Sequence, residues 1–123
     1  MYAKPRRPAH EVTQAFNDGF VIICTVRDAA APGYQPVEAL TPRLQLRYEE
    51  QRLGVQRYYE AKQNQVEISR VLRVPRAGVV TNQDAAITED GRHYRIEMVQ
   101  TVPDVLPPSL DITLSDYRQE DSP

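Results

Sequence analysis

The chain has 123 residues, of which 41% are hydrophobic, and its formal net charge at pH 7 is -2. A chain of this length forms one domain with one modest core, and so small a net charge gives no whole-molecule reason to bind nucleic acid or an anionic membrane. With 10 Pro, 2 Phe and no Trp, the core must be built from Val, Ile, Leu and Tyr, a supply that favours strands over a helical bundle.

The N-terminal segment Met1 to Thr13 carries Lys4, Arg6 and Arg7 with two prolines, and it has no apolar periodicity. Such a segment buries too little surface to offset its ordering entropy. We therefore predict a flexible basic arm over residues 1–15.

The first strand is predicted at Phe20 to Val26, a continuous apolar run that follows the turn signal Asn17-Asp18-Gly19. Such a run is typical of a strand buried on both faces. Cys24, the only cysteine, lies within it, so we expect a buried thiol and no intrachain disulfide.

The middle of the chain predicts a strand, a loop and a helix in turn. Leu44, Leu46 and Tyr48 alternate with polar residues, as in a half-buried strand. The polar stretch Glu49 to Gly54 is typical of a turn or a protruding loop. Between Val55 and Val66 the apolar residues approximate a helical stripe among good helix formers, which predicts one helix.

The later segments predict strands that are separated by prolines. Ile68 to Val74 is rich in β-formers and is closed by Pro75, which cannot donate to a ladder. Val102 to Ser109 holds three prolines and predicts an extended connection outside any ladder. Leu110 to Leu114 alternates and predicts a last strand with one buried face.

Between these segments, Ala85 to Gln100 predicts a β-hairpin with a two-residue turn at Asp90-Gly91. That loop would pair Ile87 with Tyr94, Thr88 with a solvated His93, and Ala85 with Ile96. The apolar face of the hairpin would then hold the residues Ala85, Ile87, Tyr94, Ile96 and Met98.

Together these segments predict a mainly β fold, a small antiparallel β-barrel or sandwich of about six strands with one short helix. We expect a single domain over residues 16–117 and a frayed acidic tail over 118–123. No apolar stretch approaches membrane-spanning length and the start lacks a signal peptide, so we expect a protein that is cytosolic where it is made.

Residues with catalytic or metal-binding chemistry are scattered. His10 and His93 have no second ligand at metal-binding spacing, and Cys24 has no activating histidine nearby in sequence. The five glycines stand singly, so no phosphate-binding loop exists. We therefore expect no metal, no cofactor and no enzymatic activity.

One basic and aromatic cluster remains, formed by Arg43, Arg47, Tyr48, Arg52, Arg57, Tyr58 and Tyr59. Such a cluster could stack on bases and meet phosphates, which would suit an OB-like protein that binds single-stranded nucleic acid. It could equally form a protein interface, because Tyr and Arg are enriched at binding hot spots. A third interpretation puts the tyrosines in the core and leaves the arginines solvated.

Four stretches, in this order, resemble the phage head-tail connector proteins, also called head-tail adaptor or head-closure proteins. They are FNDGFVIICTV, LQLRYEEQRLGVQRYYEAKQNQVEISRVLRVPR, ITEDGRHYRIEMVQ and PDVLPPSLDITL. The resemblance covers about Phe16 to Tyr117, and its most specific elements are RVPR, EDGxxYxI and the ending PPSLDITL.

The resemblance implies a small β-barrel that assembles as a ring between portal and tail, joins head to tail and closes or extends the DNA channel. The implied partners are the portal or adaptor ring, the tail proteins and further copies of the chain, with DNA nearby in the channel and no membrane. By position, the residues Ile87, Asp90, Gly91, Tyr94, Ile96, Leu110, Ile112 and Leu114 would be scaffold. The residues implied at subunit contacts are Arg47, Glu49, Glu50, Arg52, Arg57, Tyr58 and Tyr59.

Overall fold

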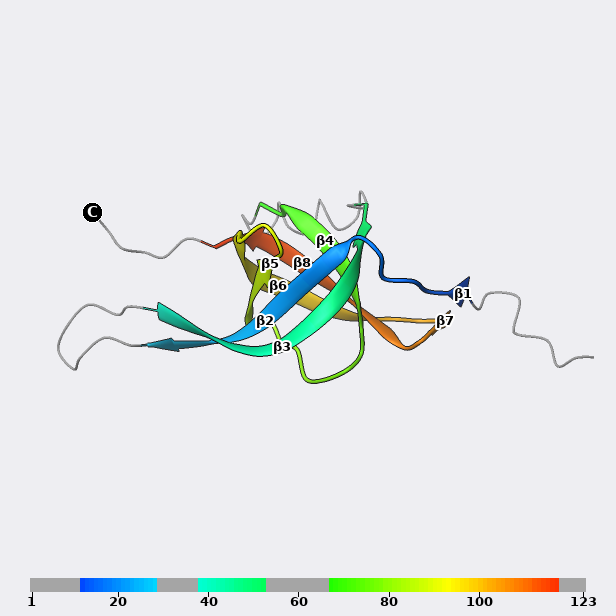
Figure 1. Cartoon of the computed structure of the whole chain (residues 1–123), viewed down its shortest axis with the longest axis horizontal. Coiled ribbons are helices and arrows are strands. Elements are labelled where there is room, and N and C mark those ends of the chain that lie inside the picture. Colours follow the sequence, from blue (N-terminus) through cyan, green and yellow to red (C-terminus); the bar gives the residue numbers. More distant parts are fainter. Residues whose placement is uncertain (1–11, 29–37, 53–66, 118–123) are drawn as a thin grey trace, which may run out of the picture.

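The computed structural model describes residues 12–28, 38–52 and 67–117, and Figure 1 shows their arrangement. The eight strands are β1 (Val12–Thr13), β2 (Gly19–Asp28), β3 (Glu38–Gln51), β4 (Arg70–Pro75), β5 (Ala85–Thr88), β6 (His93–Val102), β7 (Val105–Leu106) and β8 (Ser109–Asp116). The described residues contain no helix. The helix predicted at Val55 to Val66 lies outside them, as do most of the basic arm and the acidic tail.

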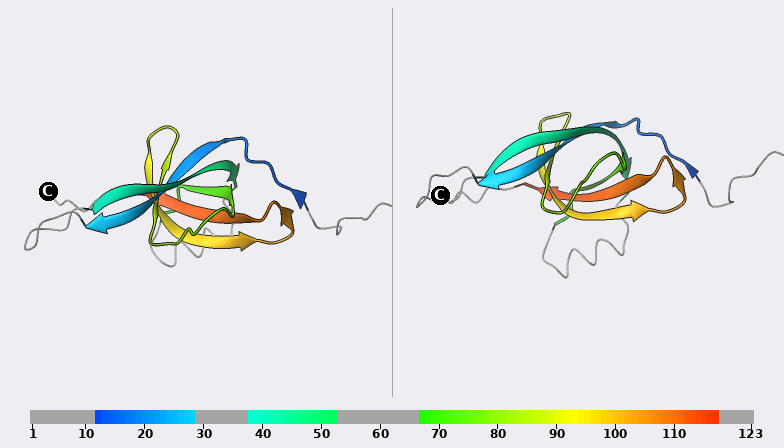
Figure 2. Two further views of the ribbon diagram at one scale, coloured as in Figure 1. Left: turned by 60° about the horizontal axis from the view of Figure 1, so that its bottom comes forward. Right: turned by 90° about the horizontal axis from the view of Figure 1, so that it is seen from below.

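Six of the strands form a closed antiparallel barrel in the order β2-β3-β4-β8-β6-β5. In the right-hand view of Figure 2, β2 and β3 lie on one side of this ring and β6 and β8 on the other. The two remaining strands, β1 and β7, form a small parallel pair beside it. The predicted class, a mainly β fold with a small antiparallel barrel of about six strands, is confirmed.

The barrel is filled by apolar side chains that point inward from all six strands. They are Val21, Ile23, Leu46, Tyr48, Leu72, Val74, Ala86, Tyr94, Ile96, Leu110, Ile112 and Leu114. Each strand contributes alternate residues, because successive side chains of a strand point to opposite faces. Of the residues predicted on the buried face of the 44–48 strand, Leu46 and Tyr48 are among them, and Leu44 is partly buried against this core; the predicted Leu110, Ile112 and Leu114 are all among them.

Two predictions about strand faces are wrong. β2 is not buried on both faces, because Phe20 points outward and is 36% exposed. Conversely, β8 is buried on both faces, since residues 109–115 are all buried. Side chains of the two neighbouring strands cover its outward residues: Asp111 is ion-paired with Arg73 of β4, and the Ser115 hydroxyl donates to Glu97 of β6.

The β5–β6 hairpin forms where the sequence predicts it, but its register differs by one residue. Ile87 pairs with His93 and Ala86 with Tyr94. The turn holds three residues, because Gly91 N donates to Thr88 O (2.8 Å) and Thr88 N donates to Arg92 O (3.1 Å). Ala86 therefore faces the core with Tyr94, while Ile87 lies outside, since a slip of one residue exchanges the two faces of a strand.

The physical reason lies in the backbone of the turn. A two-residue type I′ turn needs positive φ at both central residues, but only Gly91 has it (φ 82°), and Asp90 does not. Asp90 instead accepts hydrogen bonds from the Thr88 hydroxyl (2.5 Å) and the Arg92 N–H (3.2 Å). Farther along β6, an irregularity between Ile96 and Met98 puts Met98 opposite Thr113, on the outer face.

Two segments predicted as irregular belong to strands. Glu49 to Gln51 continue β3 and pair with β4, so the predicted loop begins after Gln51 at the earliest. Within the proline-rich stretch, Val105 and Leu106 form β7, which pairs with Val12 and Thr13 of the N-terminal arm. Both errors arise because the pairing partners are distant in sequence.

Gly91→Val should lower the free energy of unfolding by about 1–3 kcal/mol, because a β-branched residue is strained at positive φ. A Cβ atom at this position would meet nothing within 4 Å, so the loss reports backbone strain alone. Urea unfolding measures it. Gly91→Asn is the matched control and should retain most of the stability, since Asn tolerates this conformation. Equal losses of stability for Gly91→Val and Gly91→Asn would show that strain at positive φ is not the cause.

Candidate interaction surface

The residues implied at subunit contacts have different surroundings. Arg47 is exposed on the outer face of β3, and its Nε donates to Phe16 O (3.2 Å). Glu49 is half-buried and faces outward, and Arg52 is exposed just after the strand. Arg57, Tyr58 and Tyr59 lie outside the described residues. The described part of the predicted interface is thus the outer face and end of β3.

Glu50 is engaged within the molecule. Its carboxylate accepts two hydrogen bonds from Arg70 at the start of β4, from Nη2 to Oε1 (2.6 Å) and from Nε to Oε2 (3.1 Å). This two-pronged geometry is the strong form of an arginine–carboxylate pair. Glu50 therefore serves primarily to join β3 to β4.

Arg70 also lies against two core tyrosines. Its guanidinium carbon is 5.4 Å from the centre of the Tyr48 ring and 5.6 Å from that of Tyr94. Arg70 Nη2 donates to the Tyr48 hydroxyl (3.0 Å), which donates to the Glu89 carboxylate (2.8 Å). Tyr48, Glu50, Arg70, Glu89 and Tyr94 constitute what we term the Arg70 cluster.

The electrostatics of the Arg70 cluster suit a structural role. Burial raises the pKa of Tyr48, and its hydrogen bond to Glu89 raises it further. The hydrogen bonds from Arg70 to Glu50 raise the already high pKa of the guanidinium. Neither Tyr48 nor Arg70 therefore changes charge near neutral pH.

The Arg70 cluster closes the barrel at the end where β3 finishes and β4 begins. It joins those two strands to β6 and to the β5–β6 turn. The Glu89 carboxylate of the cluster packs closely against Gly19 at the start of β2, where an added Cβ atom would lie only 2.6 Å from it. The sequence prediction missed Arg70 and Glu89, since nothing in their local pattern marks them as partners of Tyr48.

A second arginine, Arg43, organises the opposite end of the barrel. The register of β2 against β3 shifts at Ile23/Cys24, so Arg43 is the extra residue of a β-bulge. Its guanidinium donates to both oxygens of Asp84 (3.1 and 2.9 Å) and to Val79 O (2.6 Å). These bonds hold the β4–β5 connection against β3.

The pKa of Asp84 reflects this clamp. Burial alone would raise it, but hydrogen bonds from Arg43 and from the Thr81 N–H (2.8 Å) outweigh burial and hold the pKa below its ordinary range. A carboxylate with a lowered pKa contributes stability above its unfolded-state pKa, and that contribution disappears as the pH falls through the folded-state value.

Most of the ion pairs connect different elements of the barrel. Besides Arg70–Glu50 and Arg43–Asp84 they include Arg73–Asp111, Arg92–Asp116 and Arg95–Glu38. Glu38 also accepts a hydrogen bond from the Tyr117 hydroxyl (2.6 Å), and burial together with this bond raises the pKa of Tyr117 to about 12. Much of the arginine content is thus used in binding the chain's own carboxylates.

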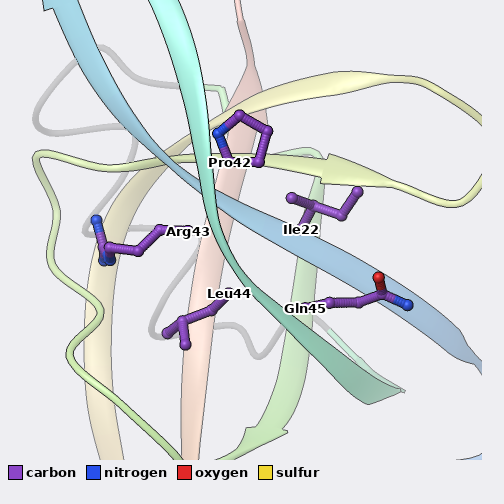
Figure 3. Close-up of a pocket in the computed structure, with 5 residues that line it drawn as sticks. All are labelled: Ile22, Pro42, Arg43, Leu44 and Gln45. Carbon is purple, nitrogen blue, oxygen red and sulfur yellow. The ribbon is translucent and has the colours of Figure 1, made fainter.

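The outer face of β2 and β3 carries a shallow hydrophobic hollow of about 230 Å³, lined by Ile22, Pro42, Arg43, Leu44 and Gln45. Figure 3 shows Ile22 and Gln45 extending to the same side of the two strands, with Arg43 and Leu44 on the other side. Ile22 and Gln45 are cross-strand partners. No residue of this hollow except Arg43 was a candidate in the sequence.

The other sequence candidates are placed as follows. Cys24 is fully buried, and burial raises its thiol pKa. His93 is exposed and pairs with Ile87, not with Thr88 as predicted. Within residues 12–28, 38–52 and 67–117, no three His, Cys, Asp or Glu side chains gather as metal ligands would.

Asp84→Asn should lower the free energy of unfolding at pH 7 by about 1.5–3 kcal/mol, because it removes a buried charged acceptor from Arg43. The deficit should shrink as the pH falls through the lowered folded-state pKa of Asp84, because the wild-type carboxylate then becomes protonated itself. Denaturant titrations over a series of falling pH values measure it. Asp116→Asn is the control: it removes the exposed ion pair with Arg92, whose N–O distance is 3.7 Å, and should cost at most about 1 kcal/mol. An equal loss of stability in both variants would contradict the stabilising role of the Arg43–Asp84 pair.

No protein-family model matches the chain, and no curated protein is significantly similar to it in sequence. Among the described residues there is no helix with the length and apolar character needed to cross a membrane.

Proposed function

We propose that this protein is a structural subunit of a phage or prophage neck, which assembles as a ring between portal and tail and joins head to tail. The observation that carries the proposal is that stretches resembling the connector family fall on consecutive strands of one closed barrel. RVPR ends β4, EDGxxYxI spans the β5–β6 turn, and PPSLDITL enters and fills β8. A small β-barrel is also the fold that the resemblance implies.

The geometry supports a binding role for the outside of the barrel. The inner faces of the strands fill the core, and the Arg70 cluster closes one end. Arg47, Glu49 and Arg52 remain on the outside as candidate contacts, while Glu50 is used in the pair with Arg70. We accordingly place neighbour contacts on the outer face of β3 and the segment that follows it.

The proposed partners are the portal or adaptor ring, the tail proteins and further copies of the chain. The described surface has few exposed large apolar side chains, namely Phe20, Val79 and Leu106. Stable obligate oligomers bury larger and more hydrophobic interfaces. The free protein should therefore associate weakly and form its ring on the assembled neck.

Nucleic-acid binding on the model of an OB-fold is less well supported. That alternative depends on an exposed Arg and Tyr cluster, but Tyr48 is 2% exposed inside the barrel and Arg43 is bound to Asp84. Salt-dependent binding of a single-stranded oligonucleotide by the purified protein would favour this alternative over the neck.

Mass spectrometry of purified virions, with chemical crosslinking, tests the proposal. The expected result is this gene product at several copies per particle, crosslinked to portal or tail subunits. Its absence from virions that contain all other neck components would overturn the proposal.

The double variant Arg52→Ala/Arg57→Ala should leave stability within about 0.5 kcal/mol of wild type, because Arg52 is exposed and exposed charges contribute little to folding. It should reduce the yield of infectious particles by about tenfold or more, as expected when interface contacts are lost. Complementation of a phage deleted for the gene measures the yield.

The matched control is Arg92→Ala, which removes an arginine that is 63% exposed on the side of the hairpin. Phage that carry this control variant should give the wild-type yield of infectious particles. Wild-type yields from the double variant would show that this part of the chain is no interface, and failure of the double variant to fold would make the two arginines structural.

A further inference from the structure

Two features of the described surface bear on how copies of this chain could meet. One is the turn between β6 and β8, which carries β7 and lies at one extreme of the molecule with β1 (Figure 1). Leu106 in β7 is 44% exposed, and Pro107 and Pro108 beside it are also exposed. The other feature is the hydrophobic hollow on β2 and β3.

The turn is held in a defined position despite its exposure. β7 pairs with β1, and Gln14 N donates to Leu106 O (2.7 Å). Gln14 is buried, and its side-chain oxygen accepts a hydrogen bond from Arg73 Nη1 (3.2 Å) on the barrel wall. Leu106 is thus an apolar side chain presented to solvent on a braced support.

The hollow is of a size to receive one such side chain. At about 230 Å³ it is smaller than the roughly 300–1,000 Å³ of typical small-molecule pockets. Ile22 and Pro42 provide apolar lining, and Gln45 lies at its margin.

The charges beside the two features are opposite. Asp104 is the only charged residue of the turn from Val102 to Ser109. Arg47 is exposed on the same face of β3 as Gln45, two residues farther along the strand. A turn seated in the hollow would bring an acidic group toward a basic one, and such complementarity orients an association.

We propose that Leu106 of one copy of this chain seats in the hydrophobic hollow of the next copy. The inference rests on the proposed function, because a ring subunit needs two different surfaces that meet head to tail. Contacts of this heterologous kind generate closed rings when the rotation between copies closes, whereas a self-complementary patch gives only a dimer.

The contact is small. One leucine and its neighbours bury far less than the approximately 800 Å² per partner of a stable interface. Free copies should therefore meet only transiently, and many such contacts should hold together once the copies are arranged on a neck.

Crosslinking of single-cysteine variants of the full chain tests this proposal. The Leu106→Cys protein alone, the Gln45→Cys protein alone and a mixture of the two are each incubated at high concentration, with copper–phenanthroline as the oxidant. Disulfide-linked dimers are expected only in the mixture, and the double variant should give a ladder of higher multimers. The native Cys24 is 0% exposed and should not react.

Gln83→Cys, at an exposed position outside the hollow, is the matched control and should give no dimer with Leu106→Cys. Dimers from Leu106→Cys alone, equal dimers with Gln83→Cys, or no dimers in any mixture would each overturn the proposed contact. The contact and the proposed function can fail separately. If virions contain the protein but the variants form no crosslink, the proposed function stands and the contact does not. If the double variant forms a ladder but virions lack the protein, the contact stands and the proposed function does not.

Discussion

The guanidinium of Arg70 sits at one of the shortest ladders of the barrel, between β3 and β4. β3 and β4 are not joined by a tight turn, and they pair only through Glu49, Glu50 and Gln51. Arg70 reinforces this short ladder by binding Glu50 and by stacking against Tyr48 and Tyr94. Because a polar network in a partly buried place is strong only when every member has a partner, closure of the barrel here depends on the whole cluster.

Much of the fold could be predicted from residues that act locally. Alternation identified the inward Leu46 and Tyr48, and Asp-Gly identified a hairpin. The register of that hairpin could not be derived, because Asp-Gly suits both a two-residue turn and a three-residue turn with a Gly bulge. In the observed turn the Asp90 carboxylate accepts hydrogen bonds from the Thr88 hydroxyl and the Arg92 N–H, and the local sequence pattern does not specify these bonds.

Long-range pairing accounts for the other errors. The polar residues Glu49 to Gln51 resemble a loop in sequence, yet they form the ladder that joins β3 to β4. The proline-rich stretch contains β7 because the N-terminal arm supplies a partner. The candidate interface likewise mixed residues of different kinds: Arg47 and Arg52 are outside, Glu50 is in the Arg70 cluster, and the neighbouring Tyr48 is in the core.

A barrel closed by such internal pairs would be a rigid frame from which outward residues could meet neighbours. The most direct test of this account is a double-mutant cycle of Arg70→Met and Tyr48→Phe, measured by urea unfolding. If the two side chains act in one network, their effects should be non-additive by more than about 1 kcal/mol. Additive effects, with Arg70→Met costing less than about 0.5 kcal/mol, would show that the barrel closes without the cluster and would contradict the account.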